Sequence, residues 1–310
     1  MTTGLPTLTV GTRGSTLARR QTACVIDLLQ TAWPGLECVE RPIVTRGDRT
    51  QRSGEPLPEI GGKGLFTAEL EQGLREGTLD LAVHSLKDLP TEDPADVTIG
   101  AVCAREDARD CLVSRDGVDL ADLPAGAVVG SSSLRRAAQL RHRRRDLEVR
   151  SIRGNVETRV RKVRDGEYDA TVLAAAGVLR LGLEAEVAEW LSEDVMLPAP
   201  GQGALAVQCR AGDERVLELL AAIDDPSARA ETTAERAFLQ ELAAGCTAPV
   251  AARGETSRAG DVRLVALVAD PEGTRMVRVS GSGSTTEVGA RLAREALETG
   301  ADEILAAIRG

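Results

Sequence analysis

Between residues 127 and 181 the chain repeats one arrangement three times: a short apolar run, a polar turn, and a helix start with an arginine at or near it. The apolar runs are residues 127–129, 147–152 and 169–173. Short apolar runs that alternate with helix-length segments predict strands and helices that alternate around a mostly parallel sheet. In such a sheet the helices begin beyond the carboxyl ends of the strands, so their N-termini and the arginines gather at one edge. The chain is therefore predicted to be an α/β protein with an anion site at that edge.

The segment 130–164 is strongly basic, whereas the whole chain carries a formal net charge of -10. A basic island in an acidic chain favours a locally held anion over a general affinity for polyanions. The planar guanidinium group matches carboxylates and phosphates with paired hydrogen bonds. We therefore expect a small ligand with several carboxylates or phosphates, although Arg143–Arg145 and Arg161–Arg164 could equally be solvated helix faces.

Two segments nearer the N-terminus also end strands with polar residues. Residues 79–83 predict a strand that leads directly into Lys87 and Asp88, and chemistry gathers at such strand ends in α/β sheets. Lys87 and Asp88 could also be an ordinary turn that ends at Pro90. Ser15 stands where the N-cap of a helix over 16–32 belongs, which leaves a capping role and an anion-binding role both open.

The length of 310 residues exceeds what one small core needs, and two chain crossings suggest lobes joined by two connections. The C-terminal part of the chain does not show the alternating strand and helix pattern of the two lobes. It predicts a helix over 231–242, strands over 262–269 and 275–280, and a helix over about 286–308. Asp-Asp-Pro at 224–226 is expected to break the chain before it. The predicted domains are residues 1–104 with 200–222, residues 105–199, and residues 223–310.

Composition makes several classes of protein improbable. Aromatic residues make up only 2% of the chain, so stacking platforms for single-stranded nucleic acid are scarce. The six cysteines form no C-x-x-C pair, and with two histidines neither a metal site nor a Ser-His-Asp triad is expected. No signal peptide or membrane span is predicted, so we expect a cytoplasmic protein with reduced thiols.

The order of the motifs closely resembles the hydroxymethylbilane synthase family, also called porphobilinogen deaminase. Gly-Gly-Lys-Gly-Leu-Phe at 61–66 and His-Ser-Leu-Lys-Asp-Leu-Pro at 84–90 carry the resemblance, as do the segments around the three arginine-bearing helix starts. The full set of matching segments is 11–15, 61–66, 84–90, 130–136, 153–159, 176–182, 198–203 and 245–246. The match spans residues 8 to 250 or so, which makes it specific.

The resemblance implies two doubly wound lobes like those of periplasmic binding proteins and a small C-terminal α+β domain, with the active site in the cleft between the lobes. It implies that four porphobilinogen molecules are joined head to tail with loss of ammonia, and that water releases the linear tetrapyrrole. It also implies a dipyrromethane cofactor that Cys246 holds through a thioether. As a bare residue, Cys246 would more naturally be a buried apolar side chain.

For the site residues, the resemblance implies Asp88 as the acid/base group that also stabilises the cationic intermediate. Arginines bind the acetate and propionate groups, and hydroxyl, amide and lysine side chains assist them. The full set of expected cofactor- and substrate-binding residues is Arg13, Ser15, Lys63, Phe66, Lys87, Ser131, Ser133, Arg135, Arg136, Arg153, Asn155, Arg159, Arg180 and Gln202. No metal, nucleic acid or membrane is expected, and the protein is expected to be a monomer.

Two other classes of protein could use some of the same residues. A hinged binding protein without catalysis could use the same arginines, but it gives no reason for Lys87 beside Asp88 or for a third domain with Cys246. A nucleic-acid binder could use Arg141–Arg145, but the acidic total and the few aromatic residues argue against it.

Overall fold

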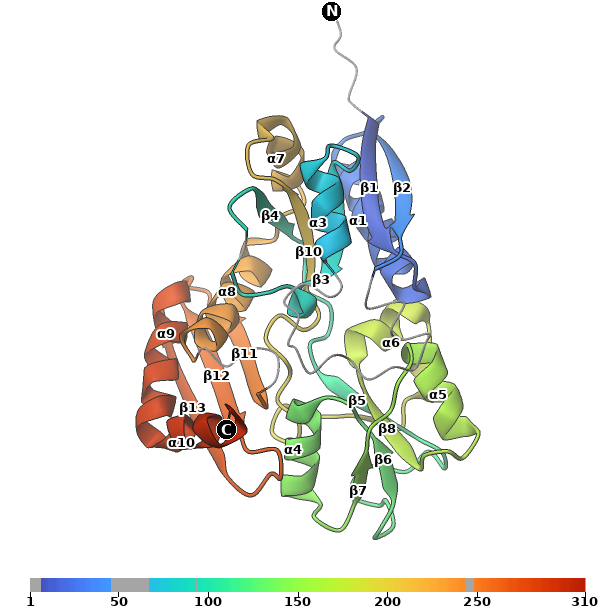
Figure 1. Ribbon diagram of the computed structural model, residues 1–310, viewed down its shortest axis with the longest axis vertical. Coiled ribbons are helices and arrows are strands. Elements are labelled where there is room, and N and C mark those ends of the chain that lie inside the picture. The colour runs from blue at the N-terminus through green and yellow to red at the C-terminus, as the bar shows by residue number, and fades with distance from the viewer. Residues whose placement is uncertain (1–6, 46–66, 93, 243–247, 310) are drawn as a thin grey trace, which may run out of the picture. The chain divides into compact units, whose positions relative to one another are not determined.

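The computed structural model describes residues 7–45, 67–92, 94–242 and 248–309 (Figure 1). The chain divides into two compact units. One unit comprises Met1–Arg105 and Ala204–Arg229, and the other comprises Glu106–Gly203 and Ala230–Gly310. Each unit is built around its own sheets and cores, so each is described by itself.

The first unit contains a five-stranded mixed sheet with the order β2-β1-β3-β10-β4 (Figure 1). Strand β1 pairs in parallel with β2 and β3, whereas β10 runs antiparallel between β3 and β4. The late strand β10 therefore completes a sheet that the first hundred residues begin. The strand bounds are β1 Thr7–Arg13, β2 Glu37–Ile43, β3 Leu81–Ser85, β4 Val97–Val102 and β10 Leu205–Arg210.

Helices cover both faces of this sheet. Helices α1 (Thr16–Ala32) and α7 (Glu214–Ala221) share one core with β1, β3 and β10. Helix α3 (Ala68–Arg75) packs on the other face through Leu70 and Leu74. The predicted helix over 16–32 is confirmed, because Ser15 caps it and its apolar residues fall on the buried side.

The second unit begins with a five-stranded sheet in the order β7-β6-β8-β5-β9. Strand β6 is parallel to β7 and β8, so the threefold strand–turn–helix repeat builds a parallel segment as predicted. Helix α4 packs on one face of the sheet, and α5 and α6 pack on the other. The bounds are β5 Asp110–Ser114, β6 Val128–Gly130, α4 Leu134–Arg143, β7 Glu148–Arg150, α5 Val156–Arg164, β8 Ala170–Ala174, α6 Ala175–Leu181 and β9 Glu189–Trp190.

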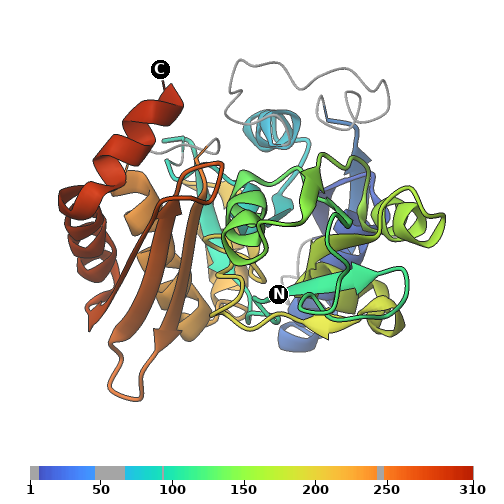
Figure 2. The same cartoon turned by 90° about the horizontal axis from the view of Figure 1, so that it is seen from below.

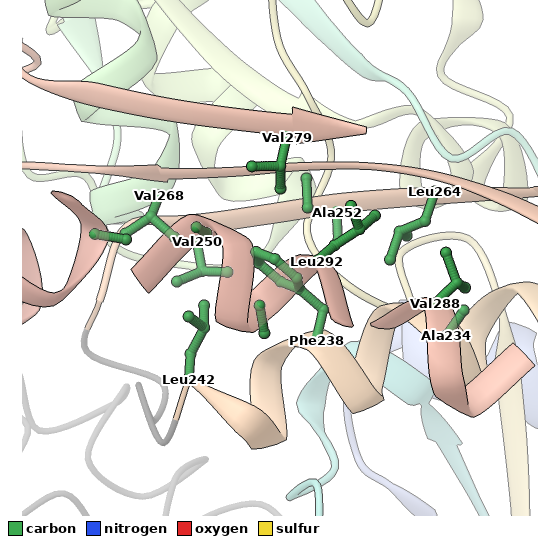
Figure 3. Packing of buried hydrophobic residues seen from close by; sticks show 14 of the residues in the cluster. Ala234, Phe238, Leu242, Val250, Ala252, Leu264, Val268, Val279, Val288 and Leu292 are labelled. Atoms are coloured by element: carbon green, nitrogen blue, oxygen red, sulfur yellow. The ribbon is translucent and has the colours of Figure 1, made fainter. Parts of the chain in front are cut away.

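The C-terminal part adds a three-stranded antiparallel sheet, β11-β12-β13. Its core contains Phe238 of α8, Leu264 and Val268 of β12, and Leu292 of α9 (Figure 3). The opposite face of the sheet lies against α4 (Figure 2), and Ala138 of α4 shares a buried cluster with Leu267 and Ala269 of β12. The bounds are α8 Pro226–Glu241, β11 Val250–Thr256, β12 Val262–Ala269, β13 Met276–Gly283, α9 Thr285–Ala296 and α10 Asp302–Arg309.

Three predictions about this C-terminal part were wrong in detail. Helix α8 begins at Pro226, where a chain break was expected, because proline suits the first helical position and Asp225 Oδ1 accepts from the Ala228 N–H at 2.7 Å. Strand β11 was not predicted. The single helix expected over 286–308 is divided, because Gly300 has a φ of 110° between α9 and α10.

The predicted fold class is confirmed: two α/β lobes, each with helices on both faces of a sheet, and a small C-terminal α+β part. The division into three domains, with the boundaries given above, stays a prediction. No helix within the described ranges is long and apolar enough to cross a membrane.

Candidate active site

A cavity of about 70 Å³ lies in the first unit at the carboxyl ends of β1 and β3. Its lining includes Arg13 at the end of β1, Ser15 and Gln21 of the adjoining helix segment, and Asp88 beyond β3. The fold therefore brings Arg13, Ser15 and Asp88 together, although they are up to 75 residues apart in the chain. This location is the strand edge at which the sequence predicted chemistry.

Ser15 acts as the N-cap of α1, and its Oγ accepts from the Ala18 N–H at 3.2 Å. Gln21, six residues further along the chain in the same helix, donates from Nε2 to Ser85 Oγ at 2.9 Å. This bond fixes the first turns of α1 against the end of β3. Gln21 was not predicted from the sequence, because an isolated glutamine in a helix carries no recognisable signal.

Asp88 is held in a single 3₁₀ turn, Leu86–Asp88, that follows β3 directly. Leu86 and Leu89 are buried on either side of it, and the Leu86 N–H donates to Ala204 O at 3.0 Å. Because the two leucines are buried as anchors, Lys87 and Asp88 are left on the outer side of the turn, where Asp88 is exposed and lines the cavity. The turn expected before Pro90 is therefore present, and it presents Asp88 to the cavity.

His84 lies on β3 and also lines the cavity, but its ring is buried. Burial, together with the positive charge of Arg13, lowers the pKa of His84 from 6.5 to about 4. Within the described residues, its Nε2 has no hydrogen-bond partner. The imidazole is therefore neutral at physiological pH. No role for His84 was predicted from the sequence.

In the second unit, three helices begin where the parallel strands end, and polar side chains cap two of them. Ser133 Oγ accepts from the Arg136 N–H at 3.4 Å, and Asn155 Oδ1 accepts from the Thr158 N–H at 2.9 Å. Ser131 Oγ accepts from the Ser133 N–H at 3.3 Å. The polar turns predicted from sequence thus form the helix starts.

Arg135 and Arg136 meet a carboxylate that the sequence did not reveal. Asp110 is fully buried at the start of β5; its Oδ2 accepts from Arg135 Nη1 at 2.7 Å, and its Oδ1 accepts from Arg136 Nη2 at 2.8 Å. Gln202 Nε2 donates to the same Oδ1 at 2.9 Å. Burial alone would raise the pKa of Asp110, but the charges of the two arginines outweigh it and hold the pKa well below its usual range.

Arg159, on α5, has no carboxylate partner in the described part of the chain, and its Nε donates to Gly154 O at 2.9 Å. Burial, with repulsion from Arg136, lowers the pKa of Arg159 to about 10. Arg180 Nη2 donates to Gly203 O at 2.7 Å, and Arg153 is exposed. The half-buried guanidinium of Arg159, which has no carboxylate partner among the described residues, is suited to bind a ligand carboxylate.

Three predicted site residues, Lys63, Phe66 and Cys246, lie outside the described residues. Across the ranges that are described, no cluster of histidine, cysteine and carboxylate side chains could hold a metal ion.

Two of the arginines considered for nucleic-acid binding make contacts within the protein. Arg141 Nη1 donates to Pro271 O at 2.6 Å, and Arg144 Nη1 donates to Leu120 O at 2.7 Å. Arg144 also forms an ion pair with Asp146. These two side chains are therefore engaged in holding loops rather than presented to a phosphate backbone.

Comparisons with known proteins account for nearly the whole chain. A family model described as "Porphobilinogen deaminase, dipyromethane cofactor binding domain" matches residues 8–218, and one described as "Porphobilinogen deaminase, C-terminal domain" matches residues 229–298. The chain is 50% identical over 302 residues to a porphobilinogen deaminase of Roseiflexus castenholzii, covering 96% of this chain and 98% of that protein. It is 48% identical over 310 residues to one of Acidothermus cellulolyticus, covering 98% and 92% of the two chains. The chain therefore belongs to the porphobilinogen deaminase family.

Proposed function

We propose that the chain acts as a hydroxymethylbilane synthase, in which Asp88 serves the chemistry and the arginines described above bind the carboxylates of substrate and cofactor. The reaction joins four porphobilinogen molecules head to tail and releases ammonia at each step. The observation that carries the proposal is the cavity at the ends of β1 and β3, where Asp88 lies with Arg13 and Ser15.

Asp88 has the position and charge that this condensation needs. Loss of ammonia from porphobilinogen leaves a cationic methylene-pyrrole, which a nearby fixed carboxylate stabilises. The same carboxylate can accept and return a proton at the ring nitrogen. Since the 3₁₀ turn is anchored by Leu86 and Leu89, the Asp88 carboxylate is held in place at the cavity.

The positively charged groups supply the second requirement, which is to hold a flexible chain of rings that each carry an acetate and a propionate. Arg13 offers a guanidinium at the same cavity as Asp88. In the other unit, Arg159 is half-buried without a carboxylate partner among the described residues, so a ligand carboxylate would relieve its desolvation. Each such charge-assisted bond contributes about 1.5–3 kcal/mol.

The same donor set fits the dipyrromethane cofactor of this family. When bound, dipyrromethane supplies the terminal pyrrole whose free α-carbon begins the condensation. Arg135, Arg136 and Arg159 would bind its carboxylates, with assistance from Ser131, Ser133 and Asn155 at the helix starts. Attachment through a thioether at Cys246, and roles for Lys63, Phe66, Lys87, Arg153 and Arg180, belong to the same proposal.

We also propose that the protein is a cytoplasmic monomer. Within the described ranges, Cys24, Cys38, Cys111 and Cys209 form no disulfide, which is typical of a reducing compartment. Cell fractionation and light scattering of the purified protein test these two points.

The test of the proposed function is a turnover assay with porphobilinogen that counts ammonia released per tetrapyrrole formed. Wild-type protein is expected to release ammonia and form a linear tetrapyrrole, whereas Asp88→Ala is expected to do neither. If the wild type binds porphobilinogen but releases no ammonia, the rival of a binding protein without catalysis is favoured instead.

A further inference from the structure

One buried carboxylate joins three of the residues expected to bind ligand. Asp110 is 0% exposed, and it accepts from Arg135, Arg136 and Gln202. Arg136 donates to the single oxygen Oδ1 of Asp110 from both Nη2, at 2.8 Å, and Nε, at 3.2 Å. Because these two donors lie on one edge of the planar guanidinium, the contact restricts the orientation of the group.

The other bonds of the two arginines complete this fixation. Arg135 Nη1 also donates to Leu197 O at 2.7 Å, and Arg136 Nη1 donates to Val172 O at 3.0 Å. Arg135 is 5% exposed and Arg136 is 7% exposed. Both side chains are therefore packed and bonded in one orientation, which does not depend on a ligand.

Donors nevertheless remain for a ligand. A guanidinium carries five N–H groups, and within the described residues Arg135 uses only those on Nη1. Its Nε and Nη2 make no hydrogen bond there, yet neither is among the fully buried unpartnered atoms. These two nitrogens therefore keep some exposed surface and open donors, while the Nη1 end is held by Asp110.

The charges of the cluster lead to the same conclusion. Asp110 balances one of the two arginine charges, so Asp110, Arg135 and Arg136 together keep one net positive charge. Arg159 adds a second positive charge, and it lies close enough to Arg136 for the charge of Arg136 to lower the pKa of Arg159. Without Asp110, the two buried guanidinium groups would repel each other and lose their common anchor. With it, the cluster remains positive and also ordered.

We infer that Asp110 is a positioning residue for the proposed reaction: it orients Arg135 and Arg136 so that the remaining donors of the two guanidinium groups meet the carboxylates of cofactor and substrate. The inference rests on the proposed function. Asp110 itself touches neither the ligand nor the reacting atoms in this account, and it acts through the two arginines that it binds.

The first test is Asp110→Glu, which keeps the charge balance but moves the carboxylate by one methylene. We expect lower dipyrromethane occupancy, measured by intact mass of the purified protein, and a KM for porphobilinogen that rises about 10- to 100-fold, with a smaller change in kcat. Near-UV circular dichroism checks that the variant is folded. Occupancy and KM equal to those of wild type in a folded variant would overturn the inference.

Asp169→Glu is the matched control. Asp169 borders the same sheet, accepts from the Val128 N–H at 2.8 Å and pairs with Arg115 at 3.2 Å, but it binds none of the predicted ligand residues. We expect this variant to unfold more easily with KM and occupancy unchanged. A rise in KM at both positions would show that loss of stability alone explains the effect.

If Asp110→Glu does not fold, a charge-balanced pair replaces it. The double variant Asp110→Asn with Arg135→Gln removes one charge of each sign. It is compared with the single variant Arg135→Gln. Since Arg136 still needs its anchor, the double variant should show a KM about 10-fold above that of the single variant. Equal KM values for the double and single variants would mean that Asp110 only neutralises a charge, which would contradict the inference. A wild type without turnover would contradict the proposed function instead, which keeps the two failures distinct.

Discussion

Nη2 of Arg136, in the first turn of α4, lies 2.8 Å from Oδ1 of Asp110 at the start of β5. The contact joins a helix start to a strand that precedes it by 26 residues in the chain. It shows that an arginine at the predicted anion edge is first bound within the protein, and that only its remaining donors are available to a ligand.

Asp88 is predicted to be the residue on which turnover depends most. Asp88→Glu keeps the negative charge but misplaces it by one methylene, so turnover should fall severely, by about 10²–10⁴-fold, without vanishing. Asp88→Ala should abolish it. Asp96→Ala serves as the control, since Asp96 forms an exposed ion pair with Arg75. Turnover of Asp88→Ala near that of Asp96→Ala would be incompatible with the role assigned to Asp88.

Arg159 is predicted to favour binding at the expense of stability. Arg159→Leu removes a half-buried charge that burial and Arg136 destabilise, so the free energy of unfolding should rise by on the order of 1 kcal/mol. At the same time, KM for porphobilinogen should rise about 10- to 100-fold. Urea unfolding and steady-state kinetics measure the two effects. Arg161→Leu, on the exposed side of the same helix, should change neither, and a stability loss in Arg159→Leu would refute this account.

His84 is predicted to make the protein less stable in mild acid. Its pKa in the folded protein is about 4, below the ordinary 6.5, so the unfolded state binds the proton more readily. The stability due to neutral His84 is fully present above pH 6.5 or so and is lost as the pH falls toward 4, by up to about 3 kcal/mol. Urea unfolding of wild type and His84→Gln at several pH values tests this. Parallel pH profiles for the two proteins would disprove it.

Gly289 is predicted to be required for the packing of α9 against α8. A Cβ at this position would lie 2.3 Å from Ala234 O and 2.8 Å from Ala237 Cβ, and a backbone carbonyl cannot easily move away. Gly289→Ala should therefore lower the free energy of unfolding by about 1–3 kcal/mol. Gly212→Ala is the control, because nothing lies within 4 Å of its added Cβ. Equal unfolding midpoints for the two variants would show that α9 can shift without cost.

Local signals in the sequence predicted the elements that depend on local physics. Ser15 before an apolar periodicity predicted α1 with its bounds, and the repeat of strand and polar turn predicted the parallel segment of β6, β7 and β8. Pro226 shows the limit of such signals, because the same residue ends one helix pattern and begins another. Its meaning depends on whether Asp225 can cap the next turn.

The site was predictable only in part, for a related reason. Asp88, Arg13 and Ser15 could be named from their motifs, but that they line one cavity depends on the pairing of β1 with β3. Asp110, Gln21 and His84 were missed, because their significance comes from partners that are distant in the chain. Burial and a partner across the sheet are properties of the fold, which a single sequence does not display.

The central claim is tested most directly by the intact mass of wild type and Cys246→Ala, each purified and then incubated with porphobilinogen. The account predicts that wild type carries an added mass equal to two condensed porphobilinogen units, gains further units with substrate, and releases ammonia. Cys246→Ala should show none of these. A wild type that carries no added mass and neither gains mass nor releases ammonia with porphobilinogen would contradict the proposed function.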